Sequence, residues 1–202
     1  MLILALDTSA DFVSVALLDE VKVYAYVDEQ MERGQAEALI PKIQYVLNQS
    51  HLTMRDVQGI AVSTGPGSFT GVRIGLACAR ALGLALNVPV YGVTCFEAWS
   101  YHLGKPVKVV LDTHRGDFFV QSFDENGIGV DEPAILTAEE LKKMLPFSAV
   151  GTGGQALCQQ IKCEDVVKIS PTSVAIGRIA LSRLDNPKPA IPLYMREADV
   201  SI

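Results

Sequence analysis

The sequence predicts a duplicated α/β fold made of two subdomains, each built around a mixed β-sheet. The first observation is an internal repeat. An apolar strand ending in Asp-Thr, a short turn and a second strand ending in Asp-Glu occur at residues 4–20 and again at residues 109–125. The second observation is the order of the patterns that follow, because helical and strand-like segments alternate in both halves. Agreement over nearly a whole hairpin favours duplication over coincidence.

The first half opens with three antiparallel strands and continues as a mixed layer of helices and strands. Apolar runs separated by turn residues place the three strands within residues 3–27. Apolar side chains spaced three and four apart then predict a helix over residues 35–49, with Leu39, Ile40 and Ile43 on its apolar face.

A glycine-rich connection joins the next strand to a long helix. Thr53 and Asp56 are spaced as a capping pair for a short helical turn before that strand. The β-branched run at residues 59–64 predicts the strand, and the apolar pattern at residues 70–86 predicts the helix. Another strand is expected at residues 88–93, which completes the first sheet.

The pattern restarts near residues 104–106, where glycine and proline interrupt it. We therefore predict an N-terminal subdomain at residues 1–104 and a shortened C-terminal subdomain at residues 105–202. After the repeated hairpin, the expected elements are a capped helix, a strand and a last helix, at residues 137–145, 149–151 and 173–184.

Composition limits the classes of function. The chain has 202 residues, 49% of them hydrophobic and 20% charged, so it can form real cores and extensive disorder is not expected. Its formal net charge of -6 indicates that the chain by itself does not bind nucleic acid, because neutralising phosphates needs a basic surface. A role beside RNA, as the acidic member of a complex, remains open.

Nothing in the sequence predicts export or membrane insertion. The apolar run at the N-terminus ends at Asp7 with no preceding basic residue, and the tract at residues 74–86 is interrupted by Arg80 and short for a bilayer. We therefore expect a cytoplasmic protein without membrane association. Its four cysteines form no Cys-x-x-Cys pair, and we expect reduced thiols at Cys78, Cys95, Cys158 and Cys163.

The glycine-rich loop before the long helix is open to several functional interpretations. Its three glycines are ordered much as in a dinucleotide-binding loop, but Pro66 removes a backbone N–H that would face a pyrophosphate. A nucleophile elbow centred on Ser68 would need glycine where Thr70 stands. No lysine follows the loop as a P-loop requires. The loop alone therefore predicts no enzyme class.

Small residues recur every fourth position along the long helix, at Gly71, Gly75, Ala79 and Gly83. Such a ridge lets another element approach closely, while each glycine costs a helix about 1 kcal/mol relative to alanine. Two interpretations stay open: the ridge packs on the chain's own sheet, or it receives a helix from a partner. We favour the partner.

Four motifs, taken in order along the chain, resemble one protein family. They are Asp7-Thr-Ser, the glycine loop at residues 64–75, Asp112-Thr-His-Arg-Gly-Asp-Phe and Pro192-Leu-Tyr-Met-Arg. Together they resemble the TsaB (YeaZ) family of bacteria. The repeated order of strands and helices is similar to the actin-like ATPase superfamily, so the resemblance implies a duplicated actin-like ATPase (ribonuclease H-like) fold.

The resemblance implies a role in forming threonylcarbamoyladenosine at position 37 of tRNA. Family members are non-catalytic partners of a paralogous catalytic subunit, TsaD, and of a small ATPase, TsaE. The expected partners are therefore a TsaD-type subunit, a TsaE-type ATPase, or a second copy of the chain when it is alone. Contact with tRNA is expected to be indirect only.

The resemblance also implies where a partner binds. Family members pair through the helices that correspond to residues 35–49 and 70–86, forming a four-helix bundle. The expected interface residues are Gln35, Ala36, Leu39, Ile43, Gly71, Val72, Gly75, Leu76, Ala79 and Gly83.

In the actin-like superfamily, paired aspartate loops and a glycine turn hold a nucleotide. The residues at those positions are Asp7, Thr8, Ser9, Asp112, Gly151, Gly153 and Gly154. Ser9 stands where active relatives usually have glycine, so backbone approach to a phosphate is hindered. We expect a vestigial site with no resident cofactor, although weak binding of ATP or ADP within a complex stays open. The alternative function is a stand-alone actin-like nucleotide-binding kinase or ATPase.

The catalytic paralogue carries a pair of metal-binding histidines just after the strand that corresponds to residues 88–93. Cys95 and Trp99 occupy those two positions here, and only the acid between them, Glu97, persists. Tryptophan cannot ligate a metal, and one cysteine does not replace two imidazoles. We therefore expect no metal site and no enzyme activity of the chain's own.

Overall fold

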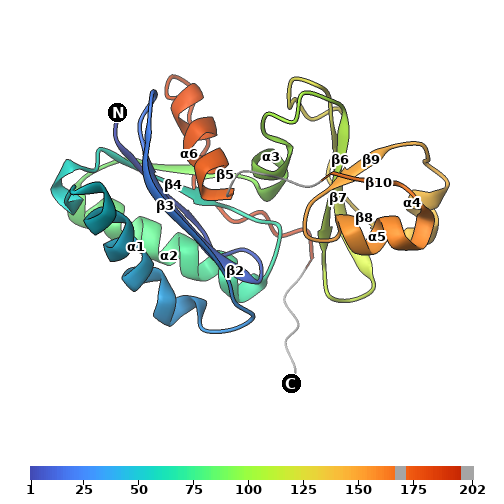
Figure 1. Ribbon diagram of the computed structural model, residues 1–202, viewed down its shortest axis with the longest axis horizontal. Coiled ribbons are helices and arrows are strands. Elements are labelled where there is room, and N and C mark those ends of the chain that lie inside the picture. The colour runs from blue at the N-terminus through green and yellow to red at the C-terminus, as the bar shows by residue number, and fades with distance from the viewer. Residues whose placement is uncertain (167–171, 197–202) are drawn as a thin grey trace. The chain divides into compact units, whose positions relative to one another are not determined.

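The computed structural model describes residues 1–166 and 172–196 (Figure 1). The chain divides into two compact units. Unit 1 comprises Met1–Ala98 and Ser170–Leu193, and unit 2 comprises Trp99–Ile169 and Tyr194–Ile202. Unit 1 is thus formed from two separate stretches of the chain.

The sheet of unit 1 has the strand order β3-β2-β1-β4-β5. Its strands are β1 (Ile3–Asp7), β2 (Phe12–Leu18), β3 (Val23–Gln30), β4 (Gly59–Ser63) and β5 (Val90–Val93). The first three strands pair antiparallel, whereas β4 pairs parallel with both β1 and β5. The predicted mixed sheet with three antiparallel strands at its start is therefore confirmed.

Helices cover both faces of this sheet (Figure 1). The helices of unit 1 are α1 (Gln35–Ser50), the short 3-10 helix η1 (Met54–Asp56), α2 (Phe69–Leu86) and α6 (Thr172–Ser182), and α3 (Cys95–Ser100) follows β5 at the boundary with unit 2. The helices α1 and α2 lie side by side on one face, and α6 lies on the other. Leu39 and Ile43 of α1 and Leu76 of α2 enter one continuous core with β1, β2 and β4. This arrangement fixes the inner faces of α1 and α2.

Unit 2 repeats the same sheet topology, with the strand order β8-β7-β6-β9-β10. Its elements are β6 (Val107–Asp112), β7 (Asp117–Phe123), β8 (Ala134–Thr137), α4 (Ala138–Lys142), β9 (Ser148–Val150), α5 (Gly154–Ile161) and β10 (Glu164–Asp165). Antiparallel and parallel pairings fall at the same places as in unit 1, which confirms the predicted duplication.

Two helix caps predicted from spacing are present. The backbone N–H of Thr53 donates to Asp56 Oδ2 at 2.8 Å, and η1 follows directly. The backbone N–H of Thr137 likewise donates to Glu140 Oε2 at 2.8 Å, and α4 follows. Each carboxylate satisfies a donor that the first turn of a helix leaves without a partner.

The division into units differs from the predicted division between residues 104 and 105. The last helix, α6, returns to the first sheet, where Ser173 Oγ lies 2.7 Å from Ser14 Oγ. Arg178 Nη1 donates to the carbonyl of Asp19 at 2.6 Å, and Gly177 leaves room for Leu18 against the helix. These contacts join residues 159 positions apart, so no local pattern could have indicated them.

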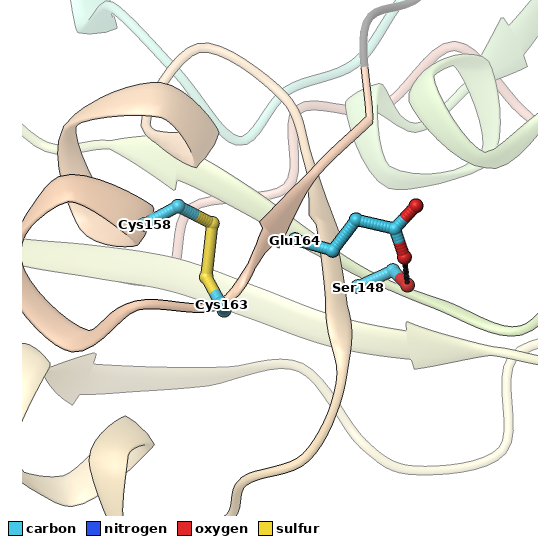
Figure 2. Close-up of a disulfide and its surroundings, with 4 residues drawn as sticks. All are labelled: Ser148, Cys158, Cys163 and Glu164. Atoms are coloured by element: carbon cyan, nitrogen blue, oxygen red, sulfur yellow. Dashed lines mark hydrogen bonds between the residues drawn. A yellow bond between two sulfur atoms is a disulfide. The ribbon is translucent and has the colours of Figure 1, made fainter.

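The prediction of four reduced thiols is wrong for two of the cysteines. Cys158 and Cys163 form a disulfide (Figure 2). Cys78 and Cys95 are free. Lys162 ends α5 in the left-handed conformation, with φ 60°, and this turn brings the two cysteine Cα atoms to 4.6 Å. The pairing depends on that helix end, which no pattern in the sequence predicted.

Candidate functional site

The small residues of α2 form its inner face. A Cβ atom at Gly71 would lie 2.0 Å from the carbonyl oxygen of Thr8, and one at Gly75 would lie 2.8 Å from Thr8 Oγ1. At Gly83 the nearest atom would be Cγ2 of Val90, at 2.4 Å. The ridge therefore packs on the sheet of unit 1, which is the alternative that the sequence analysis did not favour.

This packing encloses most residues of the predicted partner surface. Gln35 and Ala36 begin α1, and the Nε2 of Gln35 donates to the Met31 carbonyl at 3.1 Å. The other predicted interface residues are buried inside unit 1, namely Leu39, Ile43, Gly71, Val72, Gly75, Leu76, Ala79 and Gly83. Ala36 is exposed and Gln35 is partly exposed, and partner binding through the predicted residues stays a prediction.

The outward sides of α1 and α2 carry exposed apolar side chains. Ile40 and Tyr45 of α1 are 56% and 49% exposed, and Leu84 of α2 is 86% exposed. Ala77 and Ala81 lie on the same outward side of α2. We refer to these five residues as the outer helix face.

Sequence reasoning missed the outer helix face for an identifiable reason. Ile40 was assigned to the apolar face of its helix, although it points outward. In α2 both sides are rich in alanine and leucine, so hydrophobic periodicity distinguishes them poorly. The usable signal was the pair Arg73 and Arg80, which are exposed and mark the outward side.

By length and composition alone, α2 could cross a membrane, and it is the one such helix in the described part of the chain. Core helices of folded domains meet the same criterion. Here the glycines at 71, 75 and 83 are packed on the sheet. The opposite side of the helix, which carries Leu84, is exposed.

The first aspartate loop, residues 7–9, comes at the end of β1 and is held in place by hydrogen bonds within unit 1. Asp7 Oδ1 accepts hydrogen bonds from the Ser9 N–H at 2.9 Å and from Ser9 Oγ at 2.6 Å. The Ser9 carbonyl accepts from the Ser68 N–H at 2.7 Å, and Thr8 Oγ1 donates to the Gly71 carbonyl at 2.7 Å. The glycine loop therefore contacts the aspartate loop directly, which explains its glycines.

Asp7 is a buried carboxyl group in this cluster. Its Oδ2 atom and Thr172 Oγ1 are the buried side-chain oxygens without a hydrogen-bond partner in the described residues. Burial raises the pKa of Asp7 above its ordinary value, and hydrogen bonds from Ser9 offset only part of that effect. Burial, followed by the nearby Asp7 charge, raises the pKa of Cys95 to about 12.

This burial predicts how stability depends on pH. The pKa of Asp7 in the folded chain lies above its unfolded value of 3.8. The protonated carboxyl group therefore adds to the free energy of unfolding below pH 3.8, and this contribution is lost as pH rises through the folded pKa. Asp7→Asn keeps the Oδ1 acceptor and removes the buried charge. We expect the stability of the variant relative to wild type to be greater at pH 8 than at pH 3.

Urea unfolding at several pH values measures this difference. Asp112→Asn is the matched control, because Asp112 is the equivalent residue of the second repeat but its side chain is 35% exposed. If the free energies of unfolding of Asp7→Asn and wild type differ by the same amount at every pH, the prediction is contradicted.

The second aspartate loop lies in unit 2 with its own glycine turn. Asp112 Oδ1 accepts from the His114 N–H at 2.7 Å, which repeats the contact that Asp7 makes with Ser9. A Cβ atom at Gly151 would meet the Val110 carbonyl at 2.4 Å, and one at Gly153 would lie 2.7 Å from the Phe118 ring. These glycines are required by packing inside unit 2.

The third glycine of the turn, Gly154, faces Asp165, whose Oδ1 atom would lie 2.9 Å from a Cβ atom added to the glycine. The predicted nucleotide residues thus fall into two groups, one in each unit: Asp7, Thr8 and Ser9 in unit 1, and Asp112, Gly151, Gly153 and Gly154 in unit 2. Nucleotide binding across them stays a prediction.

The two residues at the expected metal positions, Cys95 and Trp99, both lie on α3. Cys95 Sγ lies 3.0 Å from Ser9 Oγ and 3.0 Å from Ser63 Oγ. Glu97, between them, accepts hydrogen bonds from Arg183 and Lys188, each at 2.7 Å. Over residues 1–166 and 172–196, no group of three or more His, Cys, Asp or Glu side chains could hold a metal ion.

Comparison with known proteins gives the family. A family model described as TsaD, tRNA N6-adenosine threonylcarbamoyltransferase, matches residues 26–175. The chain is also 34% identical over 170 residues to the tRNA threonylcarbamoyladenosine biosynthesis protein TsaB of Escherichia coli strain K12, covering 77% of the chain and 73% of that protein. The chain belongs to the TsaB (YeaZ) family. The resemblance seen in its four motifs is thereby confirmed.

Two further relatives match this TsaB-family chain over different lengths. An uncharacterized protein of Mycobacterium tuberculosis (strain ATCC 25618 / H37Rv) is 30% identical over 199 residues, covering 98% of the chain and 92% of that protein. TsaB of Bacillus subtilis strain 168 is 32% identical over 132 residues, covering 63% of the chain and 58% of that protein.

Solved structures confirm the fold predicted for a TsaB-family protein. YeaZ from Pseudomonas aeruginosa superposes with a TM-score of 0.81 at 23% identity, covering 96% of the chain and 99% of that structure. An activator of 2-hydroxyisocaproyl-CoA dehydratase from Clostridium difficile, with bound ADPNP, superposes with a TM-score of 0.60 at 11% identity, covering 92% and 96%. The duplicated actin-like ATPase (ribonuclease H-like) fold is confirmed by these neighbours.

Proposed function

We propose that this TsaB-family chain is a non-catalytic, cytoplasmic subunit of the system that forms N6-threonylcarbamoyladenosine at position 37 of tRNA. In this proposal it docks a TsaD-type catalytic subunit, helps recruit a TsaE-type ATPase and contacts tRNA only indirectly. The names of its relatives from Escherichia coli and Bacillus subtilis support the pathway. Alone, the chain pairs with a second copy through the same surface.

The outer helix face carries the proposal. Ile40 and Tyr45 on α1 and Leu84 on α2 are apolar and exposed on neighbouring helices that share one face of the sheet. Ala77 and Ala81 are small, so a helix from a partner can approach α2 closely. Exposed apolar surface of this kind, rimmed by charges such as Arg73, is typical of protein interfaces.

The absence of catalysis is proposed from the chemistry at two positions. Cys95 is buried and its pKa of about 12 keeps it protonated at neutral pH, so it cannot attack a carbonyl group. Trp99, at the second position, offers no lone pair for a metal. A peptidase or transferase activity would need other residues.

The decisive experiment is reconstitution of the modification. Formation of the modified nucleoside on tRNA is measured by mass spectrometry with TsaD, TsaE, ATP and threonylcarbamoyl-adenylate, with and without the chain. We expect strict dependence on the chain, and full activity of Cys95→Ala. Full activity without the chain would overturn the proposal, and ATP turnover that is lost in Asp7→Ala would favour the stand-alone ATPase.

A charge on the outer helix face should abolish docking. We expect Leu84→Glu to weaken binding of the TsaD-type subunit by about 100-fold or more, because the interface would bury an unpaired carboxylate. Since Leu84 is exposed in the isolated chain, the free energy of unfolding should change by no more than about 0.5 kcal/mol. Isothermal titration calorimetry measures the affinity.

Ile128→Glu is the matched control for this variant. Ile128 is an apolar residue of unit 2 that is 62% exposed, so the same charge is added to a comparable side chain that belongs to neither α1 nor α2. Its affinity should equal that of wild type. Equal affinities for Leu84→Glu and wild type would rule out docking through the outer helix face.

A further inference from the structure

The disulfide of unit 2 joins a helix end to an edge strand. Cys158 lies in α5, and Cys163 immediately precedes β10 (Figure 2). Both side chains are only partly buried, and both pack against the margin of the unit 2 core. A small thiol or a thiol-bearing protein can therefore approach the sulfur atoms without the core having to open.

The strand that follows the disulfide is short and lies at an edge of its sheet. Within the described residues, β10 spans two residues, pairs with β9 and contacts α5, and the Val166 N–H donates to the Ala149 carbonyl at 2.7 Å. The Glu164 carboxylate accepts from Ser148 and from Lys105, but these side chains are largely exposed. Exposed ion pairs contribute little to stability.

We propose that Cys158 and Cys163 form a reversible dithiol–disulfide pair that controls the order of β10. In the reducing direction, a thiolate of an external dithiol attacks one sulfur, and the bond between the two cysteines breaks. The second thiolate of the reagent then displaces that sulfur, which takes up a proton. Two electrons and two protons thus pass to the chain, and the dithiol leaves as a disulfide; oxidation by an external disulfide is the reverse.

The geometry favours closing the bond again after reduction. The Lys162 N–H donates to the Cys158 carbonyl at 2.9 Å, and this turn keeps Cys163 next to the last turn of α5. The two cysteines are five positions apart, so bringing them together costs little chain entropy. Cys95 does not compete for the pairing, because it is buried.

Hydrogen exchange of the full chain tests the proposal. After treatment with dithiothreitol, we expect amide exchange in peptides covering residues 158–166 to become about tenfold faster, while peptides from β1 and β4 exchange unchanged. Cys78→Ser, which removes a free thiol of unit 1, should respond as wild type does. Cys158→Ser combined with Cys163→Ser should show the faster exchange without reductant.

Equal exchange rates in the oxidised and reduced wild-type chain would overturn the proposal, even if the double variant proves unstable. Alkylation and mass spectrometry across mixtures of reduced and oxidised glutathione test reversibility. We expect the two thiols to appear together and the disulfide to return fully in oxidised glutathione. Failure to return would equally overturn it. Because neither readout involves tRNA, both tests are independent of the proposed function.

Discussion

Gly71→Ala is expected to lower the free energy of unfolding of unit 1 by about 4 kcal/mol. An added Cβ atom would lie 2.0 Å from the carbonyl oxygen of Thr8, which is backbone and cannot rotate away. In an ordinary helix the same substitution stabilises by about 1 kcal/mol. A large decrease in the free energy of unfolding, where an ordinary helix would show an increase, would therefore indicate that α2 packs closely on the first aspartate loop.

Denaturant unfolding followed by circular dichroism measures this loss, and Ala77→Leu is its control. Ala77 lies on the same helix but faces outward, so a larger side chain meets no part of unit 1. Its effect should stay within about 0.5 kcal/mol. A Gly71→Ala variant as stable as wild type would show that α2 does not pack on β1 as described.

Glu97→Gln is expected to destabilise the chain by roughly 3 kcal/mol at pH 7. Burial alone would raise the pKa of Glu97, but hydrogen bonds from Arg183, Lys188 and the Thr94 backbone outweigh it and lower the pKa to about 2. The fall from 4.5 to about 2 corresponds to that free energy. The carboxylate holds together β5, α3 and the segment after α6, since Arg183 also donates to the Gly92 carbonyl at 2.9 Å.

The sign of the pH effect follows from the lowered pKa. The ionised Glu97 carboxylate makes its full contribution to the free energy of unfolding above pH 4.5, and this contribution is lost as pH falls toward about 2. Wild type and Glu97→Gln should therefore converge in stability over that range. Thermal unfolding from pH 7 to pH 2 measures the convergence. A constant difference between the two proteins down to pH 2 would show that the ionised carboxylate is not what stabilises wild type. Glu37→Gln, at an exposed acid of α1, is the control.

The architecture could be predicted because its signals are local. Each hairpin, at residues 4–20 and 109–125, can be recognised within a short stretch of sequence, and capping pairs such as Thr137 and Glu140 mark helix starts directly. Two helices were missed, α3 and α5. Both are short, and α5 begins within a glycine-rich turn that carries little helical periodicity.

Spacing predicted the helices α1 and α2 but could not tell which of their sides is exposed, and partner docking through these helices stays a prediction. A ridge such as Gly71 and Gly75 allows close approach by any neighbour, and spacing does not say whether that neighbour is the chain's own sheet or a partner. The answer depends on which atoms lie opposite, here those of Thr8, more than sixty residues away in the chain. Exposure of Leu84 likewise depends on the assembled sheet.

The return of α6 to the first sheet has a consequence for synthesis on the ribosome. Unit 1 requires residues from both before and after the long stretch Trp99–Ile169 of unit 2, so one face of its sheet stays uncovered until translation has passed Ser182. Leu18, against which Gly177 of α6 packs, lacks that cover while this stretch is being made. The N-terminal half therefore emerges first but completes its core only after most of unit 2 has been made.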